Sequence, residues 1–179
     1  ESERLFHTPN YASFCWSIAH QGYNLHAPNG MLSAYKAAGA HRFAFAECDL
    51  NVTSDGYLIC CHNYIVYADQ ASKVINPSLQ SASGVYTTPI TIADTTLATL
   101  RTYSWGAWKS EEYATDTVPL FEDVVKICKI YGMKLFVAFL VVQRGKLMGY
   151  PGDGVGFTRT CTVLDQIPLT GTFGFGSAQ

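Results

Sequence analysis

Three short apolar runs in the first part of the chain each end in residues that can do chemistry. They are FCWSIA before His20 (14–20), FAFA before the acidic pair Glu47 and Asp49 (43–49), and YLICC before His62 (57–62). Short apolar runs rich in aromatic and aliphatic residues and bounded by turn residues are typical of buried strands. Two histidines and two carboxylates at strand ends are groups that a phosphate- or metal-handling site requires. We therefore expect the functional site here.

The chain between the second and third runs predicts a hairpin. The segment from Leu50 to Gly56 is too short for a parallel crossover, so the return strand is expected to be antiparallel. Asp55-Gly56 favours a two-residue turn because its backbone tolerates positive φ. Folding about this dipeptide places Asp49 opposite His62, with Cβ atoms about 5 Å apart; a longer loop would shift the register by a residue or two. Side-chain alternation also places Glu47 and Asp49 on one face of their strand.

Length, composition and charge limit the class of protein. A chain of 179 residues with 48% hydrophobic and 15% charged residues suits one globular domain with a sizeable core. The net charge of −2 gives no electrostatic basis for binding nucleic acid or an anionic membrane. The sequence contains no apolar stretch of about 18 residues, so it predicts no integral membrane segment.

The cysteines bear on the cellular location. The six of them form no CxxC pair, and those inside apolar segments are expected to be buried free thiols. This usage favours a reducing compartment, and we expect a cytoplasmic location. The chain opens with Glu1 rather than Met, which leaves a removed signal peptide open.

The first half of the chain predicts a βαβ unit. We expect a strand at about 13–20, a helix over 31–38 with Gly39 as its stop, and a second strand at about 42–49. The glycine-containing loop between the first strand and the helix completes the unit. A strand, a helix and a second strand in this order favour a parallel sheet.

The second half is less regular. Residues 64–92 show little periodicity and are expected to form a loop-like excursion. The remaining expected elements are a short helix within 92–100 capped by Asp94 or Thr95, an amphipathic helix over 119–131 that ends at Gly132, and a buried strand over 134–142.

Taken together, the motifs resemble the glycerophosphodiester phosphodiesterase family. The likeness runs from residue 17 to about 142, and its main motifs, in family order, are Ile18-Ala19-His20-Gln21-Gly22, Ala27-Pro28, Glu47-Cys48-Asp49, Thr53-Ser54-Asp55-Gly56 and His62-Asn63. The resemblance implies an α/β fold, a TIM-type (β/α) barrel with its site at the C-terminal ends of the strands. It implies that His20 and His62 act as general acid and base, and that Glu47 and Asp49 ligate a divalent cation, calcium or magnesium.

The chain departs from the family pattern at several places. Gln21 stands where the family has an Arg that holds phosphate, so Gln21 is the candidate for binding the substrate. Asn29 replaces a Glu, and Asn63 replaces the Asp that follows the second His. Ala138 and Leu140 take the places of a third metal-ligating Glu and of a Lys. These losses predict weaker metal and phosphate binding.

Two functions remain open from the sequence. The first is a phosphoric diester hydrolase that cleaves a small-molecule glycerophosphodiester into glycerol 3-phosphate and an alcohol in a metal-dependent reaction, with activity impaired by the replaced residues. The alternative is a non-catalytic phosphodiesterase-like binding module. A further carboxylate, such as Asp153, would distinguish them if it reached the site. The alcohol, the metal and the oligomeric state stay open.

The expected barrel is incomplete, which leaves open a truncated barrel or a chain that is a fragment. Only three parallel strands are recognisable by residue 142, and the rest of the chain is too short for five more strand–helix units. We expect a single domain over 1–179, made of a recognisable barrel part over 13–142 and an atypical Gly-rich tail over 143–179.

Overall fold

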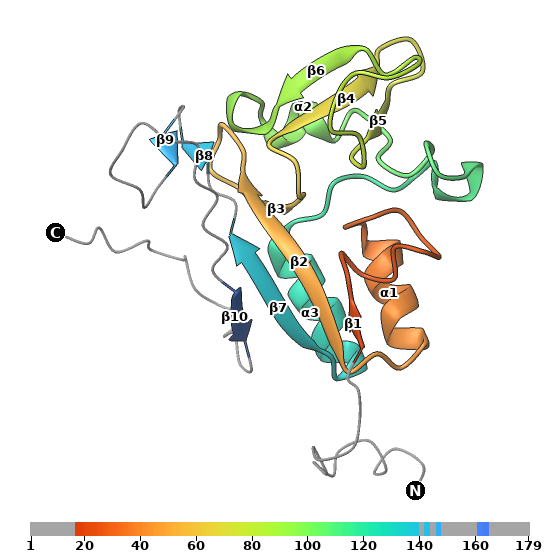
Figure 1. The fold of residues 1–179 in the computed structure, drawn as a ribbon, viewed down its shortest axis with the longest axis vertical. Helices are drawn as coiled ribbons and strands as arrows, with labels where there is room; N and C mark the ends of the chain where they lie inside the picture. The colour runs from red at the N-terminus through yellow and green to blue at the C-terminus, as the bar shows by residue number, and fades with distance from the viewer. Residues whose placement is uncertain (1–16, 140–141, 144–145, 148–160, 165–179) are drawn as a thin grey trace, which may run out of the picture.

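The computed structural model describes residues 17–139, 142–143, 146–147 and 161–164. Among them, five strands form a central sheet in the order β1-β2-β7-β10, with β3 paired to β2 (Figure 1). The strands are β1 (Ile18–Ala19), β2 (Phe45–Val52), β3 (Leu58–Cys60), β7 (Lys134–Phe139) and β10 (Cys161–Leu164). β1, β2 and β7 run parallel, whereas β3 and β10 pair with their neighbours in antiparallel fashion.

The predicted βαβ unit is confirmed, with shifted bounds. Helix α1 (Leu32–Ala40) connects β1 to β2, and Ala19 pairs with Ala46 across the two strands. The expected helix stop at Gly39 is wrong, because Gly39 is buried inside α1. A Cβ at this position would come within 2.2 Å of the Tyr131 ring, so the missing side chain is what admits that ring. Residues 13–16 of the first expected strand lie outside the described residues.

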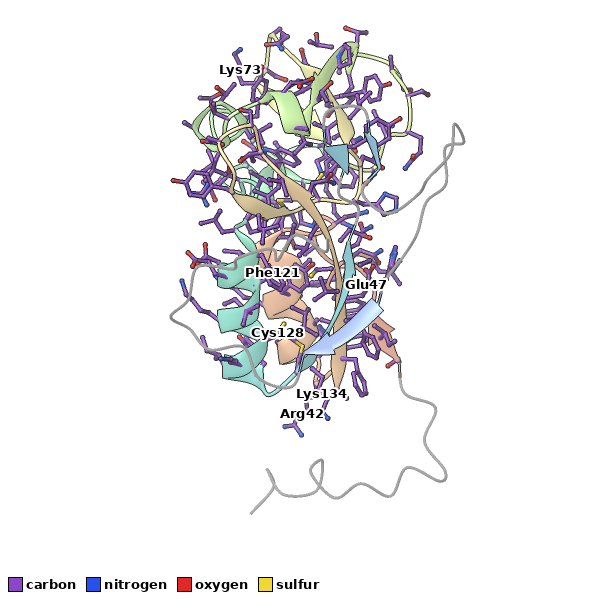
Figure 2. All side chains as sticks on the ribbon, turned by 90° about the vertical axis from the view of Figure 1, so that its left-hand side faces the viewer. Arg42, Glu47, Lys73, Phe121, Cys128 and Lys134 are labelled. Carbon is purple, nitrogen blue, oxygen red and sulfur yellow. The ribbon has the colours of Figure 1, made fainter. Side chains whose placement is uncertain are left out.

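The predicted helix before the last parallel strand is also confirmed. It is α3 (Phe121–Tyr131), and Gly132 ends it with a left-handed φ of 67°. α1 and α3 cover the same face of the sheet (Figure 1). Phe121 and Cys128 of α3 belong to the core packed there (Figure 2). Tyr35 of α1 belongs to the same core. The described part of the expected strand over 134–142 is β7, which ends at Phe139, and β8 (Val142–Gln143), which pairs with β9 (Lys146–Leu147).

The expected loop-like excursion over 64–92 is wrong. The segment forms a second, antiparallel sheet in the order β5-β4-β6, from β4 (Ile65–Asp69), β5 (Val74–Asn76) and β6 (Thr88–Thr91). Along β4 the side chains alternate between buried and half-buried. The half-buried positions include Ile65 and Tyr67, so apolar residues on both faces conceal the alternation in the sequence.

A separate core supports the small sheet. It includes Val66, Ile75 and the fully buried Trp105. Helices η2 (Ile92–Asp94) and α2 (Leu97–Leu100) follow β6, and η3 (Glu111–Tyr113) lies further along. The predicted cap of the short helix is wrong, because Thr96, rather than Asp94 or Thr95, accepts from a backbone N–H of α2. The small sheet lies beyond the C-terminal ends of β2 and β7 (Figure 1).

The hairpin after β2 differs from its prediction by one residue. Leu50 pairs with Cys60, and the N–H of Cys61 donates to the carbonyl of Asp49 at 3.0 Å. Cys61 therefore lies opposite Asp49, and the predicted pairing of Asp49 with His62 is wrong.

The turn explains this shift. The N–H of Thr53 donates to the carbonyl of Tyr57 at 3.0 Å, which encloses three residues, 54–56, instead of two. Gly56 takes a left-handed φ of 85°, the conformation that the last residue of a three-residue hairpin loop requires. The one-residue shift is what a longer loop predicts.

The buried thiols agree with their prediction where the structure describes them. Cys60, Cys61 and Cys128 are buried and free, as is Cys48. None of the helices in the described part of the chain has the length and apolar character needed to cross a bilayer.

Candidate functional site

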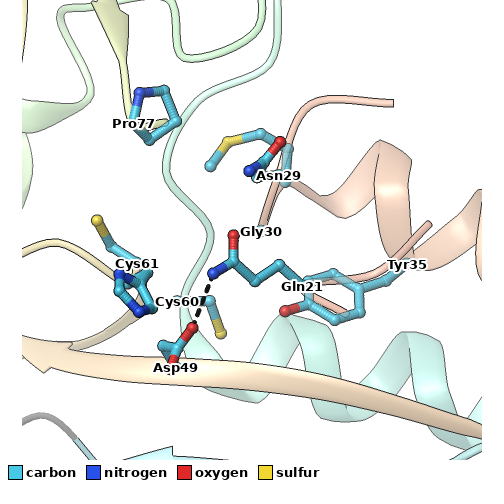
Figure 3. Close-up of a pocket in the computed structure, with 10 residues that line it drawn as sticks. Gln21, Asn29, Gly30, Tyr35, Asp49, Cys60, Cys61 and Pro77 are labelled. Atoms are coloured by element: carbon cyan, nitrogen blue, oxygen red, sulfur yellow. Dashed lines mark hydrogen bonds between the residues drawn. The ribbon is translucent and has the colours of Figure 1, made fainter. Parts of the chain in front are cut away.

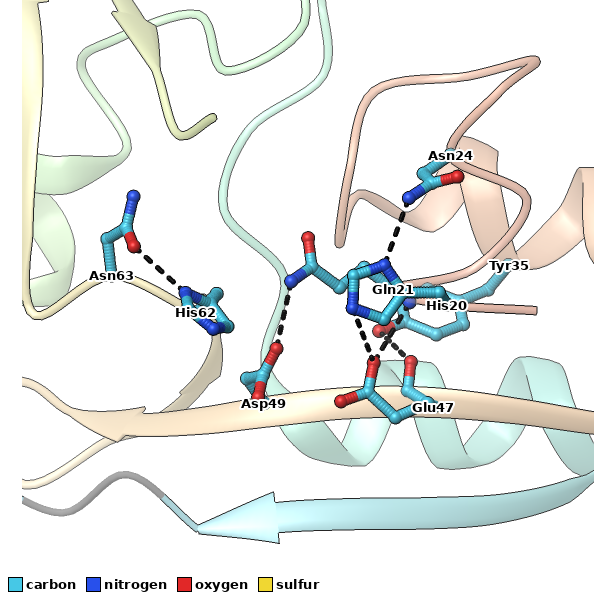
Figure 4. A network of polar contacts seen from close by, with 8 residues as sticks. All are labelled: His20, Gln21, Asn24, Tyr35, Glu47, Asp49, His62 and Asn63. Carbon is cyan, nitrogen blue, oxygen red and sulfur yellow. Dashed lines mark hydrogen bonds and ion pairs between the residues drawn. The ribbon is translucent and has the colours of Figure 1, made fainter. Parts of the chain in front are cut away.

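The five predicted site residues lie in one cluster (Figure 4). His20 and Gln21 follow β1, Glu47 and Asp49 lie on β2, and His62 follows β3. The cluster therefore combines three segments that the βαβ unit and the hairpin bring side by side. The structure confirms this grouping, while the chemical roles of the five residues stay predictions.

A strained turn directs the chain after β1 back over α1. Gln21 has a left-handed φ of 52°, which is unusual for a residue other than glycine, and Gly22 follows with a φ of 75°. A Cβ at Gly22 would lie 2.7 Å from the backbone carbon of Ala34, so only glycine fits against the helix. The carbonyl of Gln21 accepts from the N–H of Gly30 at 2.8 Å, which closes the loop.

Gln21 holds both carboxylates. Its backbone N–H donates to Oε2 of Glu47 at 3.0 Å, and its side-chain Nε2 donates to Oδ2 of Asp49 at 2.9 Å. Glu47 and Asp49 thus share one face of β2, as predicted, and Cys48 lies in the core on the other side. Asp49 is only 2% exposed. The contact between Gln21 and the acidic pair fixes the spacing of the two carboxylates.

The electrostatic environment of the pair is unfavourable for two negative charges. Burial raises the pKa of Glu47, and the negative charge of Asp49 raises it further; the Gln21 N–H and the two histidines lower it. Oδ1 of Asp49 is buried without a hydrogen-bond partner. A buried carboxylate oxygen without a partner is energetically costly, so this oxygen is suited to a cation.

The two histidines approach the carboxylates from two sides. Nε2 of His20 lies 4.0 Å from Oε2 of Glu47, and the side chain of His20 is 62% exposed. Nδ1 of His20 contacts Nδ2 of Asn24 at 3.2 Å. His62 is half-buried, and its Nδ1 contacts Oδ1 of Asn63 at 2.9 Å. Each ring is therefore oriented by an asparagine.

A pocket opens at the Asp49 end of the cluster (Figure 3). Its wall combines Gln21 and Asn29 of the first loop, Asp49 and His62 of the hairpin region, and Pro77 of the segment after β5. The excursion that looked structureless in the sequence therefore contributes to the site.

Sequence reasoning missed the residues that orient the histidines. Asn24 carries no signal, because a polar residue four positions after His20 in a loop is ordinary. The sequence identifies Asn63, next to His62, only as the replacement of an Asp. Pro77 was hidden in the excursion, and only the pairing of β4 with β5 brings it back toward the hairpin.

The position expected to hold a third metal ligand is also placed by the structure. Ala138 pairs in register with Asp49 across the parallel strands β2 and β7, so both side chains lie on the same face. Its methyl group cannot ligate a cation. Within the described part of the chain, no group of three or more His, Cys, Asp or Glu could hold a metal ion. Leu140 and Asp153 lie outside the described residues.

Comparison with known proteins decides the family. A sequence profile of the glycerophosphoryl diester phosphodiesterase family matches residues 20–144. The chain belongs to this family. No curated protein matches the sequence. The resemblance drawn from the motifs is therefore confirmed over nearly the same residues.

Solved structures of phosphodiesterases share the fold. An Oleispira antarctica phosphodiesterase in complex with the product sn-glycerol-3-phosphate matches with a TM-score of 0.58 and 24% identity, over 74% of this chain and 47% of that chain. A protein from Silicibacter pomeroyi described as a glycerophosphoryl diester phosphodiesterase matches with a TM-score of 0.57 and 19% identity, over 73% of this chain and 47% of that chain. A glycerophosphodiester phosphodiesterase from Agrobacterium tumefaciens matches with a TM-score of 0.51 and 15% identity, over 68% of this chain and 46% of that chain.

These structures confirm the predicted fold class. Family members are TIM-type barrels, and β1, β2 and β7 with α1 and α3 on one face form part of such a barrel, whose sheet is not closed within the described residues. The chain spans about half the length of these relatives.

Proposed function

We propose that this protein hydrolyses a glycerophosphodiester to glycerol 3-phosphate and an alcohol with the help of a divalent cation. The observation that carries the proposal is the convergence of His20, His62, Glu47 and Asp49 in one cluster of a family member. The product named for the Oleispira antarctica phosphodiesterase supports the substrate class. A single domain and a cytoplasmic location stay predictions.

Glu47 and Asp49 are the residues that would hold the cation. Their oxygen atoms are ligands of the kind that calcium and magnesium take. The partnerless Oδ1 of Asp49 and the raised pKa of Glu47 both support this role, because a positive charge would offset each of them. Bound there, the cation would neutralise the phosphodiester and the charge that develops on its oxygens. With Ala138 in place of a third carboxylate, we expect weak binding.

The two histidines would carry the protons. Hydrolysis breaks one P–O bond: the attacking water loses a proton, and the departing alcohol oxygen gains one. An imidazole suits both transfers, because its ordinary pKa lies near neutrality. His20 and His62 lie on either side of the Gln21 side chain, above the carboxylates (Figure 4). One histidine could thus accept a proton and the other donate one on the same side of the carboxylate pair.

Gln21 would contact the phosphate without supplying charge. Nε2 carries two hydrogens, and one of them is directed to Asp49. The second could donate to a phosphate oxygen, which is the substrate role expected from the sequence. An amide interacts with a phosphate more weakly than the Arg it replaces. The cation therefore takes a larger share of the phosphate binding in this site.

The alternative, a non-catalytic binding module, is favoured by one observation. The position beside Asp49 that should carry the third ligand is Ala138. Loss of that ligand and of the Arg lowers the positive charge available to stabilise a reacting phosphodiester.

One assay distinguishes the two functions. Release of glycerol 3-phosphate from glycerophosphodiesters with choline, ethanolamine or glycerol as the alcohol is measured with calcium, with magnesium and with a chelator. We expect metal-dependent release that is lost in Glu47→Ala. Calorimetric binding of the cation without release of product from any substrate would support the binding module instead.

A further inference from the structure

Each of the two histidines contacts a different asparagine side chain, one through the amide oxygen and the other through the amide nitrogen (Figure 4). Nδ1 of His62 lies 2.9 Å from the oxygen, Oδ1, of Asn63. Nδ1 of His20 lies 3.2 Å from the nitrogen, Nδ2, of Asn24. An amide oxygen only accepts a hydrogen bond and an amide nitrogen only donates one. The two contacts therefore require opposite protonation states at the Nδ1 atoms of the two rings.

The orientation of the Asn63 amide is determined by its other partners. Nδ2 donates to the carbonyl oxygens of Pro77 and Leu79, each at 2.9 Å, and Oδ1 accepts from Nε2 of Gln80 at 3.1 Å. Asn63 is 7% exposed. Rotating the amide would place its oxygen against two carbonyl oxygens and its nitrogen against another donor. The oxygen must face His62, so Nδ1 of His62 carries a hydrogen.

We propose that Asn63 and Asn24 are positioning residues that hold His62 and His20 in opposite tautomers. Neutral His62 has its hydrogen on Nδ1 and its lone pair on Nε2. Neutral His20 accepts from Asn24 at Nδ1 and has its hydrogen on Nε2, the atom 4.0 Å from Glu47. For His62 the tautomer follows from the fixed Asn63 amide, and for His20 it follows from the Asn24 contact together with the Glu47 carboxylate that faces Nε2.

The consequence for catalysis rests on the proposed function. An Nε2 lone pair accepts a proton, and an Nε2–H donates one. The asparagines would thus prepare the two rings for opposite halves of the proton transfer before substrate binds. The tautomer of His62 depends on contacts of Asn63 with Pro77, Leu79 and Gln80, so the segment that links β5 to β6 takes part in setting it.

The test is the nitrogen spectrum of the two rings. Long-range proton–nitrogen correlation NMR distinguishes protonated from unprotonated ring nitrogens, and it is recorded on the labelled full chain at alkaline pH, where imidazoles are neutral. Signals are assigned with His20→Gln and His62→Gln. We expect Nδ1–H for His62 and Nε2–H for His20. The same tautomer on both rings in the unaltered protein would overturn the proposal without any further variant.

A substitution at each asparagine sharpens the test. Asp presents only acceptors, so Asn24→Asp should move His20 toward Nδ1–H. Asn63→Leu removes the acceptor and should release His62 toward Nε2–H. Gln70→Ala is the control, because Gln70 accepts from Lys73 and Tyr103 in the turn between β4 and β5, at the other end of these strands from the 77–80 segment. Unchanged tautomers in Asn24→Asp and Asn63→Leu would contradict the proposal.

The spectrum separates failure of this proposal from failure of the proposed function. Absence of hydrolysis leaves the tautomers measurable. If hydrolysis is present, we expect Asn63→Leu to lower kcat by roughly tenfold or more, because general acid–base catalysis contributes about 10²–10⁴-fold. Loss of kcat with an unaltered His62 spectrum would assign Asn63 a merely structural role and overturn the proposal.

Discussion

The two ends of the site are built differently. At one end, Asp49 is 2% exposed, and His62 is held by a buried asparagine that has three further polar partners. At the other end, His20 is 62% exposed, Glu47 is 16% exposed, and the half-buried Asn24 lies in a loop. The first end is fixed by the junction of two sheets, and the second depends on how one loop lies against α1. Gln21 joins them.

The largest effect should come from removing either histidine. If both ends take part in proton transfer, His62→Gln and His20→Gln should each lower kcat/KM by about 10²–10⁴-fold, the share that general acid–base catalysis contributes. His41→Gln, which changes an exposed histidine at the end of α1, is the control and should leave the rate unchanged. Nearly full activity in His20→Gln would show that the exposed end has no catalytic part.

The next effect concerns the loop that carries His20. Gly22→Ala combines a left-handed φ with a clash against the backbone of Ala34, and should lower the free energy of unfolding by roughly 2–4 kcal/mol. Gly56→Ala is the matched control, because Gly56 has a similar φ and open space around it; about 1 kcal/mol is expected there. Urea unfolding measures both. Equal losses would mean that the contact with α1 does not anchor the loop.

A gain of cation affinity should follow from Ala138→Glu. The new carboxylate would lie beside Asp49 on the neighbouring strand and raise calcium affinity by roughly tenfold or more, because affinity rises with ligand charge. Calorimetry against Ala138→Gln, which has the same size without the charge, isolates this effect. If the two variants bind calcium equally, the cation does not sit at the buried Asp49 end.

The smallest effect tests the Glu47 end. Its pKa is raised by burial and by Asp49, so ionised Glu47 destabilises the fold at neutral pH. In the unfolded chain Glu47 ionises near the ordinary carboxyl pKa of about 4.3, whereas in the folded protein it ionises at a higher pH. The destabilisation therefore grows as the pH rises from about 4.3 through the raised folded pKa, and it is absent below about 4.3. Without metal, Glu47→Gln should therefore raise Tm by about 1–3 °C at neutral pH and leave Tm unchanged at acidic pH.

The control for this experiment is Glu122→Gln on α3, whose side chain is 63% exposed. Calcium should stabilise the unaltered protein and not Glu47→Gln. A lower Tm for Glu47→Gln at neutral pH would show that the hydrogen bond to Gln21 outweighs the burial of the charge.

The parts of the fold that the sequence predicts are those with local signals. The βαβ unit and α3 follow from apolar periodicity and from glycines at element ends, and the alternation along β2 places Glu47 and Asp49 together. These signals act over a few residues, so they survive without knowledge of the tertiary structure.

The errors arise where distant residues decide. Gly39 resembles a helix stop, but its contact with Tyr131 keeps it inside α1. The hairpin register turns on one residue in the loop before Gly56, which Asp55-Gly56 alone does not determine. The roles of Asn24 and Asn63 depend on contacts with the first loop and with the 77–80 segment, which no spacing in the sequence reveals.

The pairing of β10 with β7 has a consequence for association between molecules. An exposed strand edge offers unpaired backbone groups to other chains and promotes aggregation. Cys161–Leu164 forms an antiparallel ladder with Leu135–Ala138 and satisfies the edge of β7 over that length. β10 is thereby the last strand of the described sheet on this side, so edge-to-edge contact with a second molecule here would involve β10 rather than the strand beside the acidic pair.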